Sequence, residues 1–483
     1  MTDLFTRRVA RRGSAVLLAL LAACGDDNPA KPAVRLDTCA DANGLIAADI
    51  TTNCHLVAST TYTLKGFRKV TNGATLTIDP GTKIVGDTLT PGSALFITRG
   101  SKIDAQGTAA APIVFTSAKA AGRRRPGDWG GLLLVGNATI NRTNPPTPTI
   151  LTEGPAGENY AGGNNDADNS GTMKYVRVEF GGYAEIVNEE LNTFTFYAVG
   201  SGTTLDYLQA LAGLDDSFEW FGGTVNGKHL ISYESGDDHF DWTEGYRGKN
   251  QFMIAYQSRR LDPVPPGQPS SDQQGFEGDG CERDKPGCGS YLNTPYSMPV
   301  FANFAVIGFD NLISGYPTNG GRGMMLRRGT GGTFVNGIVA RWPQRGLNMR
   351  NYQTDTLRMR DSLIVRNVLF AENGANFDPV STTDTLNLGY ESKFVVTGSG
   401  IIQHTGTAAS LFVKLPTDTI NTTVSSFDWT PAAGAPTRTG GLSAFTGLIA
   451  ARAGSFITAT AYMGPADPAG TKWWEGWTNY APR

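Results

Sequence analysis

The sequence lacks most of the residue types and short motifs on which common enzyme classes depend. Histidine occurs only four times in 483 residues, and His55 and His404 are isolated from other candidate catalytic residues. No GxSxG, HExxH or P-loop motif is present, and no GxGxxG joins a strand to a helix. No two cysteines have the CxxC spacing of a zinc site. The sequence therefore contains no spacing that assigns a nucleophile, a catalytic base or a zinc ion.

A strong charge of one sign and long apolar runs are also lacking. The formal net charge is −3, so the composition does not indicate a nucleic-acid partner. Beyond the first 24 residues, no apolar run is long enough for a membrane helix. Long segments with helical periodicity are absent, whereas glycine contributes 60 residues. This profile is typical of an all-β chain with many turns.

The first 24 residues have the features of an export signal. Four arginines between residues 7 and 12 precede residues 15–23, a nine-residue apolar run that is too short to span a bilayer. Residues 21–24 resemble a bacterial lipobox, which predicts a signal peptide at 1–23 and a lipid on the sulfur of Cys24. The alternative is an ordinary secretory signal with an incidental cysteine. Gly25 favours the outer membrane, and residues 24–38 are expected to form the lipid anchor and a tether.

Four cysteines remain after the lipidation site. An even number of cysteines in an exported chain predicts disulfides, and the alternative is free buried thiols. The most economical connectivity joins close neighbours, which predicts the pairs Cys39–Cys54 and Cys281–Cys288.

Residues 206–248 contain the same sequence pattern twice, at an offset of 22 residues. Asp215 and Asp216 correspond to Asp237 and Asp238, and Trp220 corresponds to Trp242. A period in the low twenties is typical of stacked units that share one core, and short apolar strands between glycine-rich turns suit a right-handed parallel β-helix. Side-chain alternation predicts inward columns at Leu208, Leu230 and Phe252 and at Ala210, Ser232 and Ile254, with Tyr207, His229 and Gln251 pointing outward.

The same pattern predicts the boundaries of the parts of the chain. We expect an N-terminal cap at 39–66, tied by a disulfide, and a β-helix at 67–375 with insertions at 141–170 and 258–290. The spacing from Leu76 to Leu95 predicts tight coils near the start. Residues 376–483 are expected to form irregular final coils and a C-terminal cap, in which the aromatic tail at 473–480 seals an open coil end.

Acidic turns in the repeated segment are the first candidate site. Adjacent coils of a β-helix lie about 4.8 Å apart, so the aligned carboxylates would repel one another unless a cation or proton intervened. Carboxylate oxygens at this spacing suit Ca²⁺, which predicts a site formed by Asp215, Asp216, Asp237, Asp238 and Asp241. Glu277 and Asp279 could extend the row. The alternative is that these turn residues bond backbone N–H groups.

Two further candidates are weaker. Asp166, Asp168 and Ser170 occupy positions 1, 3 and 5 of a calcium loop similar to an EF-hand, but position 12 is Arg177, so an asparagine-rich turn is the alternative. Nine arginines lie between residues 322 and 366, against Asp355 and Asp361. Four of them are candidate ligands for an anionic glycan or for lipopolysaccharide phosphates, and the alternative is a solvated face with local ion pairs. These four are Arg327, Arg328, Arg345 and Arg350.

Several segments resemble one family of large bacterial surface proteins that is widespread in Bacteroidetes. They are residues 73–82, 111–117, 128–131, 168–172, 215–223 and 474–479. The resemblance implies a right-handed β-helix similar to that of pectate lyases, and it implies no established activity. We expect a non-enzymatic outer-membrane binding or scaffold protein that is stabilised by calcium and contacts a glycan, such as an anionic polysaccharide, or a partner protein at the surface. The alternatives are a calcium-dependent polysaccharide lyase or glycoside hydrolase, and an anchored structural stalk.

Overall fold

The structure is a computed structural model that describes residues 39–144, 149–154, 157–184, 190–309, 319–416 and 423–481. Residues Asp37–Arg483 form one compact unit. The predicted signal peptide, the lipidation site at Cys24 and the tether up to residue 38 lie outside the described residues. Among the helices of the described segments, none has the length and apolarity needed to cross a membrane.

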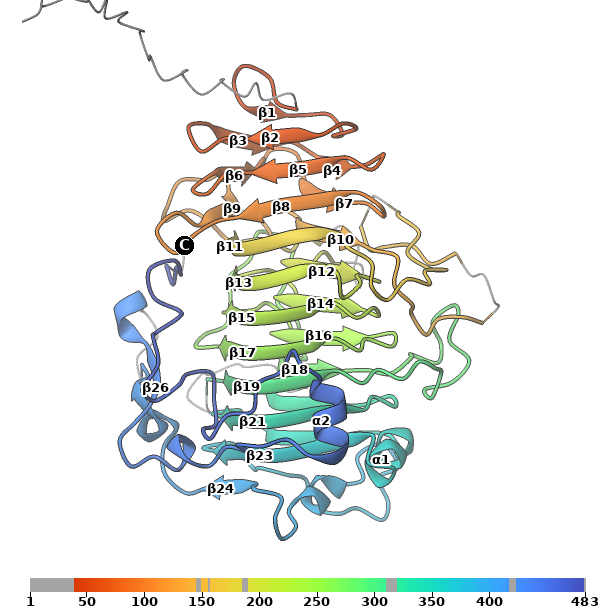
Figure 1. Ribbon diagram of the computed structural model, residues 1–483, viewed down its shortest axis with the longest axis vertical. Coiled ribbons are helices and arrows are strands. Elements are labelled where there is room, and N and C mark those ends of the chain that lie inside the picture. Colours follow the sequence, from red (N-terminus) through yellow and green to blue (C-terminus); the bar gives the residue numbers. More distant parts are fainter. Residues whose placement is uncertain are drawn as a thin grey trace, which may run out of the picture. The chain divides into compact units, whose positions relative to one another are not determined.

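Two parallel sheets make up the fold, and neighbouring strands in each sheet come from successive coils (Figure 1). Sheet B has nine strands: β4 (Phe67–Val70), β7 (Ala94–Ile97), β10 (Gly131–Val135), β12 (Phe194–Tyr197), β14 (Phe218–Phe221), β16 (Phe240–Thr243), β18 (Gln274–Gly278), β20 (Arg322–Leu326) and β22 (Arg345–Met349). Sheet A has fifteen: β1 (Leu45–Ile46), β2 (Cys54–Leu56), β3 (Thr61–Leu64), β5 (Thr75–Ile78), β6 (Lys83–Gly86), β8 (Lys102–Gln106), β9 (Ile113–Ser117), β11 (Gly171–Glu179), β13 (Thr204–Leu211), β15 (Asn226–Tyr233), β17 (Lys249–Tyr256), β19 (Val300–Ile307), β21 (Gly332–Ala340), β23 (Leu363–Ala371) and β24 (Ile402–His404). The prediction of an all-β parallel β-helix is confirmed.

The first coils contribute three short strands each, and the later coils contribute one long and one short strand. The short strands β8 and β9 pair with the two halves of the long strand β11, so the long strands of sheet A replace two short strands of the first coils. Leu76 and Leu95 were expected to lie one coil apart. Instead they lie in different sheets: Leu76 pairs with Ile103 in sheet A, and Leu95 pairs with Leu132 in sheet B. Each of these coils therefore contains more residues than the spacing from Leu76 to Leu95 predicted.

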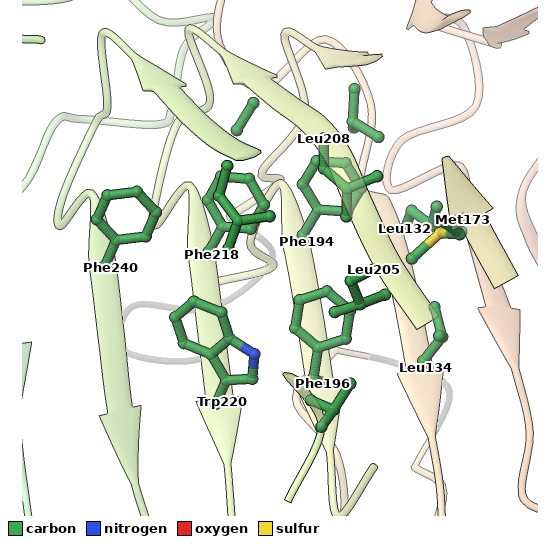
Figure 2. Close-up of a cluster of buried hydrophobic side chains, with 14 of the residues drawn as sticks. Leu132, Leu134, Met173, Phe194, Phe196, Leu205, Leu208, Phe218, Trp220 and Phe240 are labelled. Atoms are coloured by element: carbon green, nitrogen blue, oxygen red, sulfur yellow. The ribbon is translucent and has the colours of Figure 1, made fainter. Parts of the chain in front are cut away.

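The core is a set of inward columns of large apolar side chains. Along sheet B, the rings of Phe194, Phe218 and Phe240 stack on one another, with centroids 5.0 and 5.4 Å apart (Figure 2). All three side chains are fully buried. Burying one such side chain contributes about 1.5–3 kcal/mol, so the repeated apolar pattern supplies the main driving force for stacking the coils.

The register of sheet A confirms part of the expected columns and corrects the rest. Leu208 pairs with Leu230, as the offset of 22 predicts, but Leu230 pairs with Met253 instead of Phe252. The following coil is one residue longer, so each inward position in strand β17 lies one residue later than predicted, and the residues expected to be inward point outward. Ala210 and Ser232 likewise continue to Ala255 instead of Ile254.

The displaced ring of Phe252 joins an outward column at the bend of the long strands. The rings of Tyr175, Tyr207, His229 and Phe252 stack in sequence, with centroids 4.2, 4.2 and 5.2 Å apart. Each of these residues has a positive φ between 50° and 62°. A left-handed backbone is costly for bulky residues, and asparagine adopts it more readily, which explains why later coils carry Asn303, Asn336 and Asn367 at this bend.

The segment 39–66, expected to be an N-terminal cap, contains strands β1, β2 and β3 of sheet A. Both predicted disulfides are present, Cys39–Cys54 and Cys281–Cys288, each with a Cα–Cα distance of 5.8 Å. The first holds the segment before β1 to strand β2. The segment 258–290, expected to be an insertion, contains strand β18, which continues sheet B between two loops.

The C-terminal region begins beside the last coil and returns along sheet A (Figure 1). It contains the antiparallel strands β25 (Phe412–Lys414) and β26 (Asp428–Pro431) and helix α2 (Gly447–Ala453), whereas helix α1 (Tyr352–Met359) lies between β22 and β23. Short 3₁₀ helices are η2 (Tyr390–Phe394), η3 (Ala408–Leu411), η4 (Val424–Ser426) and η5 (Pro436–Arg438). The aromatic tail, expected to seal a coil end, instead covers the side of sheet A. Trp477 packs edge-on against Tyr175 and Tyr207, because the outward ring column there needs cover from water.

Candidate functional site

A column of carboxylates runs along the outer face of sheet B. In strands β14, β16 and β18, an acidic residue alternates with inward apolar residues, so the acidic side chains point away from the core. Glu219 pairs with Asp241, and Asp241 pairs with Glu277 in the next coil. Two Asp-Asp pairs precede strands β14 and β16, namely Asp215–Asp216 and Asp237–Asp238. We call this set the acidic ladder: Asp215, Asp216, Glu219, Asp237, Asp238, Asp241 and Glu277.

The ladder brings carboxylate oxygens within the range of a shared cation. Three sets of ladder residues each place one carboxylate oxygen per residue within 4.8 Å of the others. The first set is Asp215, Asp216 and Asp237. The second is Asp216, Glu219 and Asp241, and the third is Asp238, Asp241 and Glu277. All five residues predicted from the repeat belong to these groups. Oxygen atoms of this kind are the ligands that Ca²⁺ prefers.

Two ladder residues also hold the backbone of the next coil. Oδ1 of Asp216 accepts a hydrogen bond of 2.8 Å from the Asp238 N–H, and Oδ1 of Asp238 accepts one from the Gln274 N–H. One carboxylate oxygen of Asp216 and one of Asp238 therefore bond a backbone N–H group, which is the alternative role suggested for the acidic turns. By contrast, Oδ1 of Asp237 and Oδ1 of Asp241 are buried and have no hydrogen-bond partner among the described residues. Buried oxygens without a partner are costly, which favours a cation or a proton beside them.

Burial and mutual repulsion raise the pKa of the ladder carboxyls. Burial is the largest cause at Asp241, followed by the charge of Glu277, and the pKa lies well above its usual value. The pKa of Glu277 rises to about 8 because burial outweighs the opposing charge of Arg327. Without a cation, these raised pKa values favour the protonated form of the ladder carboxyls. A bound divalent cation would replace those protons.

Arginines close the ladder at the side of strand β20. Arg327 donates hydrogen bonds to Glu277 and to Asp279, the latter at 2.9 Å, and Arg328 donates to Asp279 at 2.6 Å. Although burial raises the pKa of Asp279, these guanidinium groups hold it below its usual value. The same ion pairs raise the pKa of Arg327 well above its usual value despite its burial. Arg327 is therefore a fixed positive charge.

The other two predicted arginines lie one strand further along. Arg345 donates to Asp378 at 2.5 Å, and Arg350 follows the end of β22, where its N–H donates to the Leu326 carbonyl. Three of the four predicted arginines are thus engaged in local ion pairs. Among the described residues, Arg350 forms no ion pair.

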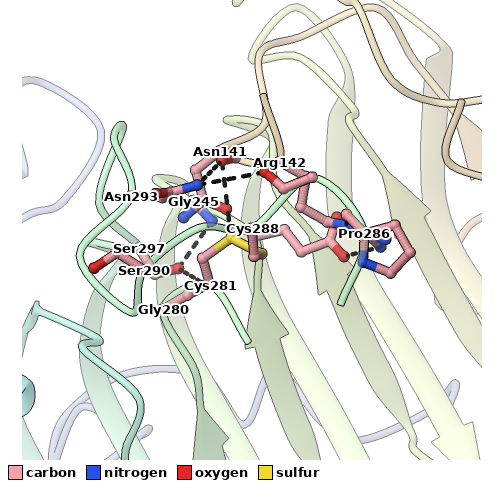
Figure 3. The surroundings of a disulfide bond; sticks show 12 residues. Asn141, Arg142, Gly245, Gly280, Cys281, Pro286, Cys288, Ser290, Asn293 and Ser297 are labelled. Atoms are coloured by element: carbon pink, nitrogen blue, oxygen red, sulfur yellow. Dashed lines mark hydrogen bonds and ion pairs between the residues drawn. A yellow bond between two sulfur atoms is a disulfide. The ribbon is translucent and has the colours of Figure 1, made fainter. Parts of the chain in front are cut away.

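Two loops enclose the outer face of the ladder and create a cavity of about 470 Å³. Arg142 donates at 2.8 Å to Glu244, which also accepts from the Tyr160 hydroxyl at 2.9 Å. Arg142 donates as well to the Pro286 carbonyl at 2.6 Å, which ties the two loops together beside the Cys281–Cys288 disulfide (Figure 3). Ladder residues Glu219, Asp241 and Glu277 line the cavity together with Arg327 and Arg328.

A comparison with protein families agrees with this architecture. Residues 48–411 of the 483-residue chain match the family described as a pectate-lyase-like beta helix domain. The chain belongs to this family. No curated protein and no solved structure match the chain.

The residues of the predicted calcium loop at Asp166 make contacts with neighbouring parts of this pectate-lyase-like β-helix. Oδ1 of Asp166 accepts from Thr139, and Oδ2 accepts from Arg247 at 2.8 Å. Asp168 accepts from the Asn137 N–H at 3.0 Å, and the Ser170 N–H donates to Thr203. The side chains of Asp166 and Asp168 and the backbone N–H of Ser170 thus connect the loop with neighbouring coils.

Sequence reasoning missed the residues that cover the ladder. Arg142, Glu153 and Tyr160 lie in a loop outside the repeat, so no periodic signal connects them with the acidic turns. Glu153 accepts a hydrogen bond from Tyr197 at 3.1 Å, and burial raises its pKa to about 8. Only the folding of the insertion over sheet B brings these groups together.

Proposed function

We propose that this protein is a lipid-anchored, outer-membrane binding protein whose acidic ladder holds Ca²⁺ and whose cavity binds an anionic glycan. The observation that carries the proposal is the stacking of three sets of carboxylates beside the fixed charge of Arg327; the sets include the buried oxygens of Asp237 and Asp241 that have no partner among the described residues. Calcium would bridge ladder oxygens and acidic groups of the glycan, while arginines at the rim would pair with further anionic groups.

Binding without cleavage is the favoured function. A polysaccharide lyase needs a base near the cation, and an arginine can act as a base only if its pKa is lowered. The ion pairs instead raise the pKa values of the three arginines that line the cavity, Arg142, Arg327 and Arg328. These residues are therefore suited to holding an anion.

A glycoside hydrolase is the second candidate. Such enzymes use one protonated and one ionised carboxyl group, and the cavity contains Glu153 and Glu277, each with a pKa of about 8. A carboxyl with this pKa carries a proton at neutral pH and could donate it to a leaving group. The family, which is named for its pectate-lyase-like fold, is compatible with either candidate.

Calcium binding is tested by calorimetry on the purified protein. We expect wild type to bind Ca²⁺ and Asp241→Asn to bind it at least about tenfold more weakly, because one charged ligand is lost. Asp104→Asn is the control and should match wild type, because among the described residues its carboxylate accepts only from the nearby Gln106 side chain. Equal affinities of Asp241→Asn and wild type would exclude the ladder as the site.

Glycan binding is tested with uronic-acid and neutral polysaccharides in Ca²⁺ and in chelator. Retention of the acidic glycans only in Ca²⁺, without new reducing ends or unsaturated products, supports the binding function. Cleavage that disappears in Asp241→Asn or Glu277→Gln would support the enzyme instead. Neither retention nor cleavage would favour a structural stalk.

The membrane anchor rests on the lipobox-like residues 21–24 and on the resemblance to Bacteroidetes surface lipoproteins. We expect Cys24→Ala to release the protein from the membrane fraction and to remove the mass of the lipid. Cys24→Ala protein that stays in the outer membrane with an unchanged mass would contradict the anchor.

A further inference from the structure

The last long strand of sheet A has a backbone edge that is only half covered. Strand β21 pairs with Leu363–Arg366 and with Val368–Ala371 of β23 on one side. On the other side, β24 pairs only with Leu369–Ala371, so the first half of β23 has no strand partner there among the described residues (Figure 1). Between the two halves of β23, the Asn367 N–H donates a hydrogen bond to the Ser399 carbonyl. An open edge of this kind is a template for another strand.

A groove of about 530 Å³ lies along this edge. Its floor is the edge of Leu363–Arg366, and each side has a wall. Phe394 and Val396 form one wall, and Phe394 belongs to the main core. Leu448 and Ile449 of helix α2 form the other wall, and half of the Leu448 side chain is exposed. The two walls correspond to the two faces of a strand, so the groove has the shape of a missing coil.

Helix α2 is fixed in place by the coils beneath it. Ala453 and the nearby Ile457 pack with Val300 and Val335 on the outer face of sheet A. Arg452 donates to the carbonyl of Asp361 at 2.7 Å. The wall formed by Leu448 is therefore held rigidly beside the open edge, and an incoming strand would not have to order it.

The charges around the groove favour an acidic occupant. Arg358, Arg366 and Lys393 line it, against Asp361 alone. Arg358 is paired with Asp355, but Arg366 donates to the Gly398 carbonyl and Lys393 lies over the Tyr390 ring. Among the ion pairs of the described residues, none involves Arg366 or Lys393. Both cations can therefore meet an anionic side chain.

We propose that this groove binds an extended segment of a partner protein, in which apolar and acidic residues alternate, by adding it as a strand to the edge of β23. Main-chain hydrogen bonds would supply affinity, apolar side chains on one face of the added strand would pack against Phe394, and acidic side chains on the other face would meet Arg366 on the side of helix α2. The proposal does not depend on the acidic ladder, which lies on sheet B.

The test uses the purified full chain and a fluorescent probe, acetyl-Thr-Val-Glu-Val-Asp-Val-Thr-amide. We expect the anisotropy of the probe to report saturable binding. Methylation of alternate backbone nitrogens in the probe should weaken binding about tenfold or more, because two edge hydrogen bonds are lost. Leu448→Asp should have a similar effect, whereas Leu89→Asp, at a side chain that is 90% exposed elsewhere, should bind as wild type.

Charge reversal separates recognition from loss of stability. The double variant Arg366→Glu and Lys393→Glu should no longer bind the acidic probe. It should instead bind a version of the probe that has lysine at both acidic positions. Failure of wild type to bind the acidic probe, or equal binding of the methylated probe, would overturn the proposal. A dimer that dissociates in Leu448→Asp would also overturn it, because the groove would then belong to a second copy of the chain.

Discussion

At the scale of single residues, close packing between coils decides which side chains are tolerated. Gly278 occupies an inward position of sheet B, next to Glu277 of the acidic ladder. A β-carbon at this position would collide with the ring of Trp242 in the preceding coil, which is fully buried. The glycine therefore allows a tryptophan to fill the core beneath the ladder. The sequence alone marks this glycine only as a break in a strand pattern.

Gly278→Ala should destabilise the protein by about 1–3 kcal/mol, because the indole of Trp242 must shift in a packed core. The midpoint of chemical unfolding measures the effect. Gly181→Ala is the matched control, since a β-carbon there would meet other atoms only at ordinary contact distances of 3.4 Å or more. Equal losses in the two variants would show that the effect comes from the glycine backbone and not from Trp242.

At the scale of elements, the C-terminal tail acts as a cover for sheet A. Asn479 donates at 2.8 Å to Gln209 through its N–H and accepts from the Gln209 side chain at 2.6 Å through its carbonyl, so the tail is paired to a coil 270 residues earlier. Tyr480 packs edge-on against Tyr233, with ring centroids 4.8 Å apart. The stack of outward rings and the tail thus form a second apolar cluster outside the solenoid core.

Trp477→Ala should cost about 3–5 kcal/mol, because a buried side chain is lost from this cluster and Tyr175 and Tyr207 become exposed. Chemical unfolding measures the loss, and protease cleavage within residues 470–481 should become faster. Tyr352→Ala serves as the control because that side chain is 62% exposed. Wild-type stability of Trp477→Ala would contradict the covering role of the tail.

At the scale of the whole molecule, the ladder makes stability depend on pH and on cations. The pKa of Glu277 is about 8 in the folded protein, against 4.5 as its ordinary value. The folded state therefore binds more protons than the unfolded state between these values, and stability falls as pH rises. Burial lowers the pKa of His239 from 6.5 to about 3, so this residue makes stability rise with pH between those values. Above pH 6.5 its effect on stability no longer changes with pH.

In chelator, the free energy of unfolding should therefore decrease between pH 6.5 and pH 8, by about 1.4 kcal/mol per pH unit for each carboxyl that remains protonated. In saturating Ca²⁺ the decrease should disappear, because the cation binds the ionised ladder. Unfolding curves across this pH range measure both slopes. Asp241→Asn should flatten the slope in chelator, whereas Glu475→Gln, an exposed change, should leave it as in wild type. Identical slopes with and without Ca²⁺ would argue against cation binding.

The sequence by itself determined the fold class, the two disulfides and the carboxylate row. These features depend on local periodicity: residues 22 positions apart meet because each coil buries one apolar set, and Glu219 and Asp241 then align without any long-range information. Close cysteine pairs need only a short loop.

Only the tertiary structure decided the positions of residues that do not follow the 22-residue repeat. One additional residue moved Phe252 to the outward column, although its local sequence fits the inward one. Arg142 and Tyr160 reached Glu244 because a loop folded over sheet B, and the aromatic tail found sheet A across some 300 residues of chain. Contacts between segments without a shared repeat depend on loop closure and packing, which no local pattern encodes.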